Sequence, residues 1–347
     1  MKLLRLLLLF FFLVALVIGG GAFWLYNALH TPIDHNQAEQ YITIERGLPA
    51  YTILQRLQDQ GIIQAPLATK IYMNLYKESA QLEAGDYLFP SPINPIEVLH
   101  QMQDGKKRSQ ALSIPEGWTR FEIADRIAKQ FPGKSSKTAE EILAMMDDVR
   151  LIKDIDPQAS NLEGYLYPTT YEFELDAEPE AIIRKMVRQF EAIWQPEWDT
   201  LAQERGKTKR EIMIIASLIE NESKVDDERA LVASVIYNRL ERGMLLGIDA
   251  TNVYIAKLLG RWDGIIHKSD VEIDHPYNTR KISGLPPGPI SSASKSAIEA
   301  ALKPAQIDYL YYVLNVDAND GSHHFYSTSA EFLKGKAAYQ RWLAKQR

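Results

Sequence analysis

The sequence predicts an α+β protein with an N-terminal transmembrane helix, a small βααβ module, a mixed α/β linking region and a mainly helical C-terminal domain with long loops. Three observations lead to this fold class. An uncharged run of 21 residues, Leu6 to Tyr26, lies near the N-terminus. A strand-like segment, a glycine and a helical apolar pattern occur twice, 70 residues apart. Further on, an apolar helix leads into five carboxylates between residues 220 and 228.

The composition limits the class of protein. With 347 residues, 46% hydrophobic and 24% charged, the chain is typical of a globular protein of two or three domains. A formal net charge of −6, with no basic block beyond the N-terminus, argues against a nucleic-acid partner. The absence of cysteine excludes disulfides, thiolate catalysis and cysteine-based zinc sites.

The N-terminal run predicts a membrane anchor. As a helix, Leu6–Tyr26 spans about 31 Å, close to the hydrocarbon thickness of a bilayer. Lys2 and Arg5 precede the run, which predicts a cytoplasmic N-terminus and a single pass through the inner membrane. A cleaved signal peptide is the alternative, because Gly20 and Ala22 resemble a small-residue cleavage site. The run is longer than a typical signal core, so we expect a retained anchor.

The first part of the chain after the anchor carries an internal repeat. Ile42–Leu57 matches Leu112–Ile127 position by position, and each copy turns at a glycine between a strand-like and a helical stretch. In the second copy, Thr119 and Glu122 form a capping box that defines where the helix begins.

Between the two copies, the pattern predicts a small βααβ module. Pro66 suits the first turn of a helix that continues to Glu78, Gly85–Phe89 is typical of a return strand, and Asn94-Pro95 opens a further helix that ends at Gly105. The order strand, helix, helix, strand resembles a small LysM-like glycan-binding module. The alternative is an α+β spacer that holds the rest of the chain away from the membrane, because no sugar site is visible in the sequence.

The remaining chain is expected to form two further regions. Asn161–Phe173 is rich in aromatic residues and turn formers, and a long amphipathic helix follows from Glu178 to about Trp194. Thr208 and Glu211 form another capping box, which places a domain boundary near residue 205. The predicted parts are the cytoplasmic N-terminus 1–5, anchor 6–26, linker 27–40, LysM-like module 41–108, second α+β region 109–205 and C-terminal domain 206–347.

The helix that begins after Thr208 singles out one carboxyl group. On a helical wheel its isoleucines and Leu218 form an apolar stripe, and Glu222 falls inside that stripe. Glu220 lies about 200° away, because residues two apart do not share a helix face. An apolar surrounding raises the pKa of a carboxyl group and suits it to general acid catalysis. The alternatives are a solvated helix end, or a buried glutamate that pairs with Arg229 or Arg239.

Several later segments also carry polar groups within apolar or rigid surroundings. Ala230–Leu240 predicts a second helix that presents Asn238 and Arg239. Pro276–Ser292 contains four prolines and predicts a rigid loop suited to a binding wall. Asn319–Ser329 predicts a short loop with two histidines.

These segments together resemble the YceG-like endolytic murein transglycosylases, the MltG family. LEGYLYPTTY, ENES, ASVIYNRL, DATNVY, PYNT, GLPPGPI and GSHHF occur here in the order typical of that family. The resemblance implies cleavage of the β-1,4 bond between N-acetylmuramic acid and N-acetylglucosamine without water, leaving a 1,6-anhydromuramic end. It places the catalytic glutamate at Glu222. The chain departs from the family pattern at Ala250, where proline is frequent, and at Arg280, where an aromatic residue is frequent.

The resemblance implies that one carboxyl group suffices. Glu222 acts first as acid and then as base, whereas a standard glycosidase needs two carboxylates at a set separation. The candidate substrate-binding residues are Glu220, Asn238, Asp249, Tyr277, Asn278, Thr279 and His323. Each has a plain structural alternative, such as capping a turn for Asn278 and Thr279 or satisfying backbone for Asn238. No metal or cofactor is expected, because the chain has no HExxH, GxSxG or glycine-rich phosphate motif.

Two other functions remain open from the sequence. A membrane-tethered, lysozyme-like hydrolase would use Asp249 as its second carboxylate, and a non-catalytic wall-binding scaffold would use the acids structurally. The resemblance and the tether imply a periplasmic enzyme that acts on nascent glycan strands and terminates their elongation. Its partners would then be peptidoglycan and the penicillin-binding protein synthases.

Overall fold

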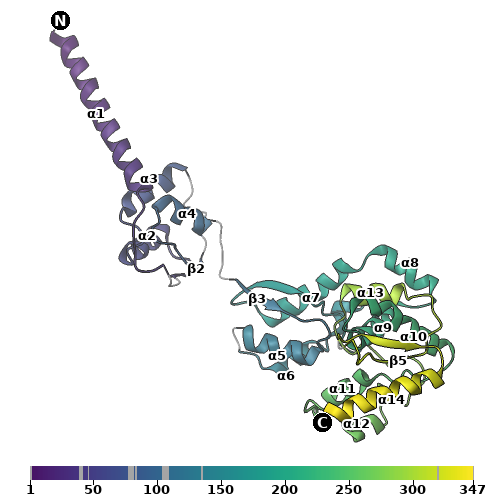
Figure 1. Ribbon diagram of the computed structural model, residues 1–347. Coiled ribbons are helices and arrows are strands. Elements are labelled where there is room, and N and C mark those ends of the chain that lie inside the picture. Colours follow the sequence, from purple (N-terminus) through teal and green to yellow (C-terminus); the bar gives the residue numbers. More distant parts are fainter. Residues whose placement is uncertain are drawn as a thin grey trace. The chain divides into compact units, whose positions relative to one another are not determined.

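The structure, a computed structural model, describes residues 2–38, 42–45, 47–76, 82, 84–103, 109–133, 136–318 and 320–346. The chain forms two compact units, residues 1–110 and 111–347, which are coloured along the sequence in Figure 1. The described residues are mostly helical, with short paired strands, so the expected mixture of α and β structure with a predominance of helix is confirmed.

The first unit begins with the apolar helix α1 (Lys2–His30). Its segment Leu7–His30 has 24 residues and is strongly apolar, and most of its large apolar side chains are exposed, whereas Leu29 is buried. At 1.5 Å per residue this segment is about 36 Å long, enough to cross the hydrocarbon part of a bilayer. By length and composition the helix can therefore serve as a single-pass anchor.

The rest of the first unit has strand, helix, helix and strand in that order. These are β1 (Ile42–Ile44), α2 (Ala50–Asp59), α3 (Pro66–Tyr76) and β2 (Gly85–Tyr87), followed by α4 (Pro95–Gln103). β1 and β2 pair antiparallel, with Ile42 opposite Tyr87, over a core that includes Leu54, Leu57, Val98 and Leu99. The expected helix end at Glu78, the stop at Gly105 and the module limits at 41 and 108 lie outside the described residues.

The elements from β3 onward belong to the second unit, except that the first two residues of β3 lie before its boundary at residue 111. They are β3 (Ser109–Ser113), α5 (Arg120–Gln130), α6 (Ala139–Met145), η2 (Val149–Ile152), β4 (Thr170–Glu174), α7 (Pro179–Ile193), α8 (Pro196–Glu204), α9 (Lys209–Glu222), η3 (Asp226–Glu228), α10 (Arg229–Glu241), α11 (Asp249–Leu258), α12 (Lys268–Glu272), α13 (Lys295–Leu302), β5 (Tyr311–Leu314), β6 (His323–Tyr326) and α14 (Ser329–Gln346). One hydrophobic core runs from Leu112 to Leu302, so its side chains come from both sides of residue 205. The finer division at that residue stays a prediction.

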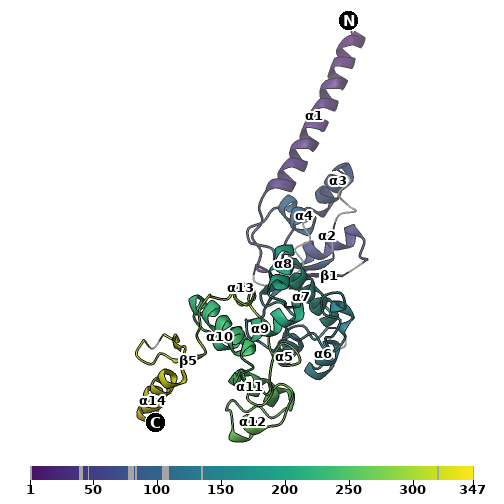
Figure 2. The same cartoon turned by 90° about the vertical axis from the view of Figure 1, so that its right-hand side faces the viewer.

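Helix α9 lies at the centre of this core. It packs against α10 and α13, and Figures 1 and 2 show the three helices side by side. The Thr208 backbone N–H donates to Glu211 Oε2 at 2.8 Å, and the Glu211 N–H donates to Thr208 Oγ1 at 3.2 Å. The capping boxes predicted at Thr208 and Thr119 are both present. Every residue from Ile212 to Ile219 is buried, so α9 is enclosed on all sides rather than along one stripe.

The C-terminal part of the chain forms a hairpin covered by a helix. β5 and β6 pair antiparallel, with Tyr311 opposite Tyr326, and α14 packs on both strands. The expected loop Asn319–Ser329 therefore contains a strand, which corrects the prediction; Asn319 itself lies outside the described residues. The strand forms because His323–Tyr326 completes the backbone hydrogen bonds of the aromatic strand β5.

The proline-rich segment 276–292 has no helix or strand, as predicted, and is fastened to α9. The Ile290 N–H donates to Ser217 Oγ at 3.1 Å, and Asn221 Nδ2 donates to Ser291 Oγ at 2.7 Å. A Cβ on Gly164 would lie 2.5 Å from Pro289 Cβ, and the φ of Gly164 is +83°. Only glycine fits there, so the GLPPGPI segment lies directly against the LEGYLYP segment.

Candidate active site

Glu222 is the last residue of α9, where the chain leaves the core. Ser223 follows in an extended conformation, with φ −112° and ψ 117°, and ends the helix. The half-buried Glu222 carboxyl accepts a hydrogen bond of 2.6 Å from the Tyr312 hydroxyl of β5 at Oε2. Burial raises the pKa of Glu222 above its ordinary value, and the Asp249 charge adds to that rise. The Tyr312 bond and the charges of His323 and Arg239 act in the opposite direction, and burial prevails.

His323 and Glu228 support the strand that carries Tyr312. His323 Nδ1 lies 2.9 Å from Glu228 Oε2, and the His323 backbone N–H donates to Glu228 Oε1 at 2.7 Å. The His323 ring meets the Tyr312 ring edge-on at 5.3 Å between centroids. The buried Glu228 therefore holds the start of β6, and β6 in turn places the Tyr312 ring beside Glu222.

Arg239 is a cation on α10 whose position is fixed by hydrogen bonds. Its Nε donates to the Leu310 carbonyl at 2.7 Å and its guanidinium donates to the Leu246 carbonyl at 2.6 Å. Burial lowers the pKa of Arg239, and the negative charge of Glu222 partly offsets this effect. Backbone carbonyls rather than a carboxylate fix its position, so its positive charge remains available to an anion that forms near Glu222.

Glu220, the second predicted acid of this helix end, lies in a different environment. Its Oε2 accepts hydrogen bonds from the Ser294 backbone N–H at 2.8 Å and from Ser294 Oγ at 2.5 Å. Arg229 lies 3.0 Å from the same oxygen, and both side chains of this ion pair are almost fully buried. Glu220 thus links α9 to the start of α13 and to α10 instead of lying beside Glu222.

Asp249, by contrast, acts on Glu222 electrostatically. It is the first residue of α11, it is about half exposed, and its charge raises the pKa of Glu222. Arg280 Nε donates to Asp249 Oδ1 at 2.8 Å and forms an ion pair with it.

Asn278 and Thr279 are fully buried and bonded within the protein. Asn278 Nδ2 donates to the carbonyls of Val271 at 3.0 Å and Ile273 at 2.7 Å. Thr279 Oγ1 accepts from the Ile248 N–H at 2.9 Å. The Asn278 bonds hold the loop before Arg280 against the end of α12, and the Thr279 bond holds it against the start of α11. The structure places neither side chain beside Glu222.

Tyr277 belongs to a separate buried cluster. Its ring packs on Tyr254 at 5.0 Å between centroids, and burial raises its pKa. Glu163 lies in the same cluster and accepts from the Arg120 backbone N–H at 3.1 Å. Burial raises the pKa of Glu163 to about 7. The sequence pattern alone did not single out Glu163, although it lies within the LEGYLYP motif.

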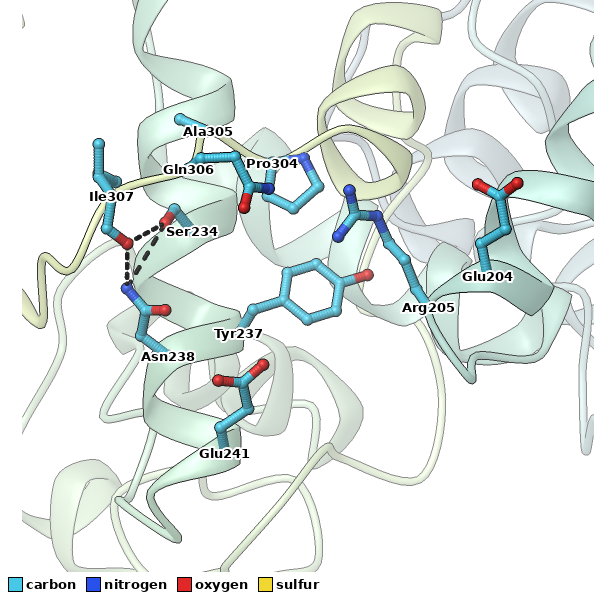
Figure 3. A pocket seen from close by; sticks show the side chains of 10 residues that line it. All are labelled: Glu204, Arg205, Ser234, Tyr237, Asn238, Glu241, Pro304, Ala305, Gln306 and Ile307. Atoms are coloured by element: carbon cyan, nitrogen blue, oxygen red, sulfur yellow. Dashed lines mark hydrogen bonds between the residues drawn. The ribbon is translucent and has the colours of Figure 1, made fainter.

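Asn238 lies at the edge of a pocket of about 380 Å³. Its Nδ2 donates to the carbonyls of Ile307 and Tyr309, each at 2.9 Å. Figure 3 shows Asn238 and Ser234 directed at Ile307, while the Tyr237 ring points toward Arg205 on the other side of the pocket. Asn238 therefore fastens the segment that leads into β5.

Three of the predicted residues thus interact at one site, namely Glu222, Asp249 and His323. The structure brings three further residues to this site, namely Tyr312, Arg239 and Glu228. Tyr312 lies in a run of aromatic and β-branched residues followed by Asp, Asn and Gly, a hairpin signal that could have revealed it. Glu228 carried no comparable signal, because its partner His323 is 95 residues away. Within the described part of the chain, no group of three or more His, Asp or Glu side chains is arranged to hold a metal ion.

Comparisons with known proteins show which family this chain resembles. The model of the YceG-like family matches residues 42–338. The endolytic murein transglycosylase of Bacillus subtilis is 32% identical over 340 residues, which cover 92% of this chain and 90% of that protein. Its counterpart in Streptococcus pneumoniae is 31% identical over 86% of this chain, which spans 58% of that longer protein.

A solved structure is also similar. The crystal structure of a YceG-like protein from Listeria monocytogenes has 33% sequence identity and a TM-score of 0.58, and the match covers 85% of this chain and 97% of that chain. The family match spans most of the chain and includes all the residues described around Glu222. The chain belongs to the YceG-like family.

Proposed function

We propose that this chain is an endolytic peptidoglycan lytic transglycosylase with Glu222 as its catalytic acid and base. The coarser assignment, a murein transglycosylase that acts on peptidoglycan, follows from the family and from the names of its relatives. The observation that carries the finer proposal is the Glu222 carboxyl itself, half-buried, with a raised pKa and a single phenolic donor on Oε2. A raised pKa favours the protonated carboxyl, which is the form that donates a proton to a substrate.

The Tyr312 bond assigns different tasks to the two carboxyl oxygens. Because the phenol donates to Oε2, the neutral carboxyl carries its proton on Oε1. In the first step Oε1–H protonates the glycosidic oxygen while the bond from the muramic C1 to that oxygen breaks. In the second step the carboxylate accepts the proton of the muramic C6 hydroxyl as its oxygen bonds to C1. The proton balance closes, no water is consumed, and the product carries a 1,6-anhydro ring.

The surrounding charges support both steps. Arg239 and His323 stabilise the carboxylate that exists between the steps, and the Asp249 charge favours the protonated form that starts the cycle. Asp249 also faces the positive charge that develops at C1. The binding roles first assigned to Glu220, Asn238, Tyr277, Asn278 and Thr279 become positioning roles in this proposal, because their polar groups are bonded within the protein.

The site of action follows from the anchor. With α1 in the inner membrane and residues 1–5 in the cytoplasm, the second unit faces the periplasm and reaches glycan close to the bilayer. New strands emerge there, so the enzyme would terminate strand elongation next to penicillin-binding protein synthases. The βααβ part of the first unit would act as a LysM-like module or as a spacer.

Replacement of Glu222 by Gln tests the proposal. We expect the full-length protein to release anhydro-muropeptides from purified sacculi, measured by mass spectrometry. Glu222→Gln should lower this rate by about 10³-fold, the scale of a lost general acid, while its melting temperature stays unchanged. Asp227→Asn, in the same acidic stretch but exposed, is the matched control and should keep full activity.

Three outcomes contradict the proposal in different ways. Undiminished anhydro ends from Glu222→Gln would remove Glu222 from the chemistry. Reducing ends in place of anhydro ends would identify a hydrolase, and Asp249 would then be its second carboxylate. Binding of sacculi without any cleavage by the unmodified chain would identify a scaffold.

A further inference from the structure

A second pocket lies in the same unit, between α5, α6 and the C-terminal end of α11. Its volume is about 400 Å³. Phe121, Leu143 and Trp262 give it apolar walls, and Asp125, Glu140 and Lys257 add polar groups. Nothing in the chemistry at Glu222 uses these residues.

The charges of the pocket exclude an acidic ligand. Asp125 and Glu140 are exposed carboxylates at its edge. Lys257, the cation among the lining residues, already forms an ion pair with Glu122, with 2.6 Å between Lys257 Nζ and Glu122 Oε1. Asp125 forms an ion pair with Lys129, so Glu140 supplies the remaining negative charge at the edge, and this charge disfavours a phosphate or a carboxylate.

The chemistry of the walls matches a neutral sugar. A pyranose ring presents a flat face of C–H groups and a rim of hydroxyl and amide donors. The rings of Phe121 and Trp262 offer large apolar surfaces on which the C–H face can stack. The carboxylates of Asp125 and Glu140 can accept hydrogen bonds from the hydroxyl and amide groups of the rim. Of the two sugars of murein, N-acetylglucosamine is uncharged, whereas N-acetylmuramic acid carries a lactyl carboxyl that bears the peptide.

Helix α11 connects this pocket to the candidate active site. Asp249, at its first residue, acts on Glu222, and Lys257 at its other end lines the pocket. A helix of ten residues is about 15 Å long, so the pocket lies about one helix length from Asp249.

We propose that this pocket is a distal subsite for an N-acetylglucosamine unit of the glycan strand. The proposal rests on the proposed function and deepens it, because an enzyme that cuts inside a strand must recognise sugars remote from the scissile bond. Binding energy at such a remote unit favours long strands over short ones.

The test measures binding separately from cleavage. In the full-length Glu222→Gln protein, binding of β-1,4-linked N-acetylglucosamine oligomers is followed by isothermal titration calorimetry, with a dimer and a hexamer as probes. Trp262→Ala should weaken hexamer binding about tenfold and leave dimer binding unchanged. Glu140→Gln should weaken hexamer binding less. Leu259→Ala, an exposed apolar residue at the same helix end, is the matched control and should bind like the parent.

The outcomes are distinct. Equal hexamer affinity for Trp262→Ala and its parent would overturn the subsite, and so would an equal loss for dimer and hexamer. If Trp262→Ala does not fold, Trp262→Phe keeps an aromatic surface and should lose no more than about threefold, while a full loss from that conservative change contradicts stacking. Absence of any murein cleavage by the unmodified chain would refute the proposed function without affecting the binding result.

Discussion

Two glutamates at the C-terminal end of α9 lie on opposite sides of the helix and in opposite environments. On one side Glu220 is neutralised by Arg229 and bonded to Ser294. On the other side Glu222 has a phenolic donor, and burial raises its pKa. The residues are two positions apart on one helix. The comparison shows that the partners brought by other elements, rather than the residue type, separate a structural acid from the proposed catalytic one.

A third carboxyl group sharpens this comparison. Burial raises the pKa of Glu163 to about 7, but only 2% of this residue is exposed and its oxygens accept from the Arg120 backbone N–H. Glu222 combines a raised pKa with partial exposure. The raised pKa reflects burial in both residues. Partial exposure, which would let a substrate reach the carboxyl, distinguishes Glu222 from Glu163.

The largest expected effect concerns Glu163 and the pH dependence of stability. Its folded pKa lies above its unfolded value, so its protonated form stabilises the fold below pH 4.5 and this contribution is lost as the pH rises through about 7. The full loss is roughly 3 kcal/mol. Glu163→Gln should remove this part of the pH dependence, measured by urea unfolding from pH 4 to 8. Identical slopes for the two proteins would contradict the assignment.

The Glu220 side predicts the next largest effect. Glu220→Gln leaves Arg229 buried with only the exposed Asp226 as its carboxylate partner, 2.8 Å away. We expect the free energy of unfolding to fall by about 2 kcal/mol, with activity per folded molecule within a factor of three. Asp227→Asn, an exposed acid of the same stretch, is the matched control and should leave stability unchanged. A loss of turnover without a loss of stability would place Glu220 in the chemistry.

Tyr312→Phe tests the Glu222 side. The phenol stabilises the Glu222 carboxylate and lowers its pKa, so removal of the hydroxyl should raise that pKa. Glu222 would then stay protonated to higher pH, and the alkaline limb of kcat/KM should move upward. We expect about a tenfold loss at neutral pH, since the carboxylate formed in the first step loses a donor. An unchanged alkaline limb of kcat/KM would show that Tyr312 contributes packing alone and does not stabilise the Glu222 carboxylate.

Asp249→Asn should give the smallest shift, in the opposite direction. Its negative charge raises the pKa of Glu222, so the amide should lower that pKa and move the alkaline limb downward. Because Asp249 is about half exposed and paired with Arg280, we expect a change of about threefold or less. A loss comparable to that of Glu222→Gln would instead support Asp249 as a second catalytic carboxylate.

Local patterns in the sequence were sufficient for many elements. The caps at Thr208 and Thr119 define helix starts through contacts three residues apart, and the structure has both. The apolar N-terminal run corresponds to α1. The wheel, by contrast, treated α9 as a helix with one buried face, whereas the residues from Ile212 to Ile219 are buried on all sides. It selected Glu222 through the stripe, yet it placed Glu220 as a flanking group when that side chain is also buried.

The sequence by itself determined the apolar N-terminal helix, the helix boundaries with strong caps and the absence of helix or strand in the proline-rich segment, and it singled out Glu222 as a candidate acid, because each depends on neighbours within a few positions. The tertiary structure alone decided which groups surround that acid. Tyr312 is 90 residues from Glu222, and Arg229 reaches Glu220 from another helix. The pKa of a carboxyl group depends on the charges and donors around it in space, and these are set only when distant segments pack together.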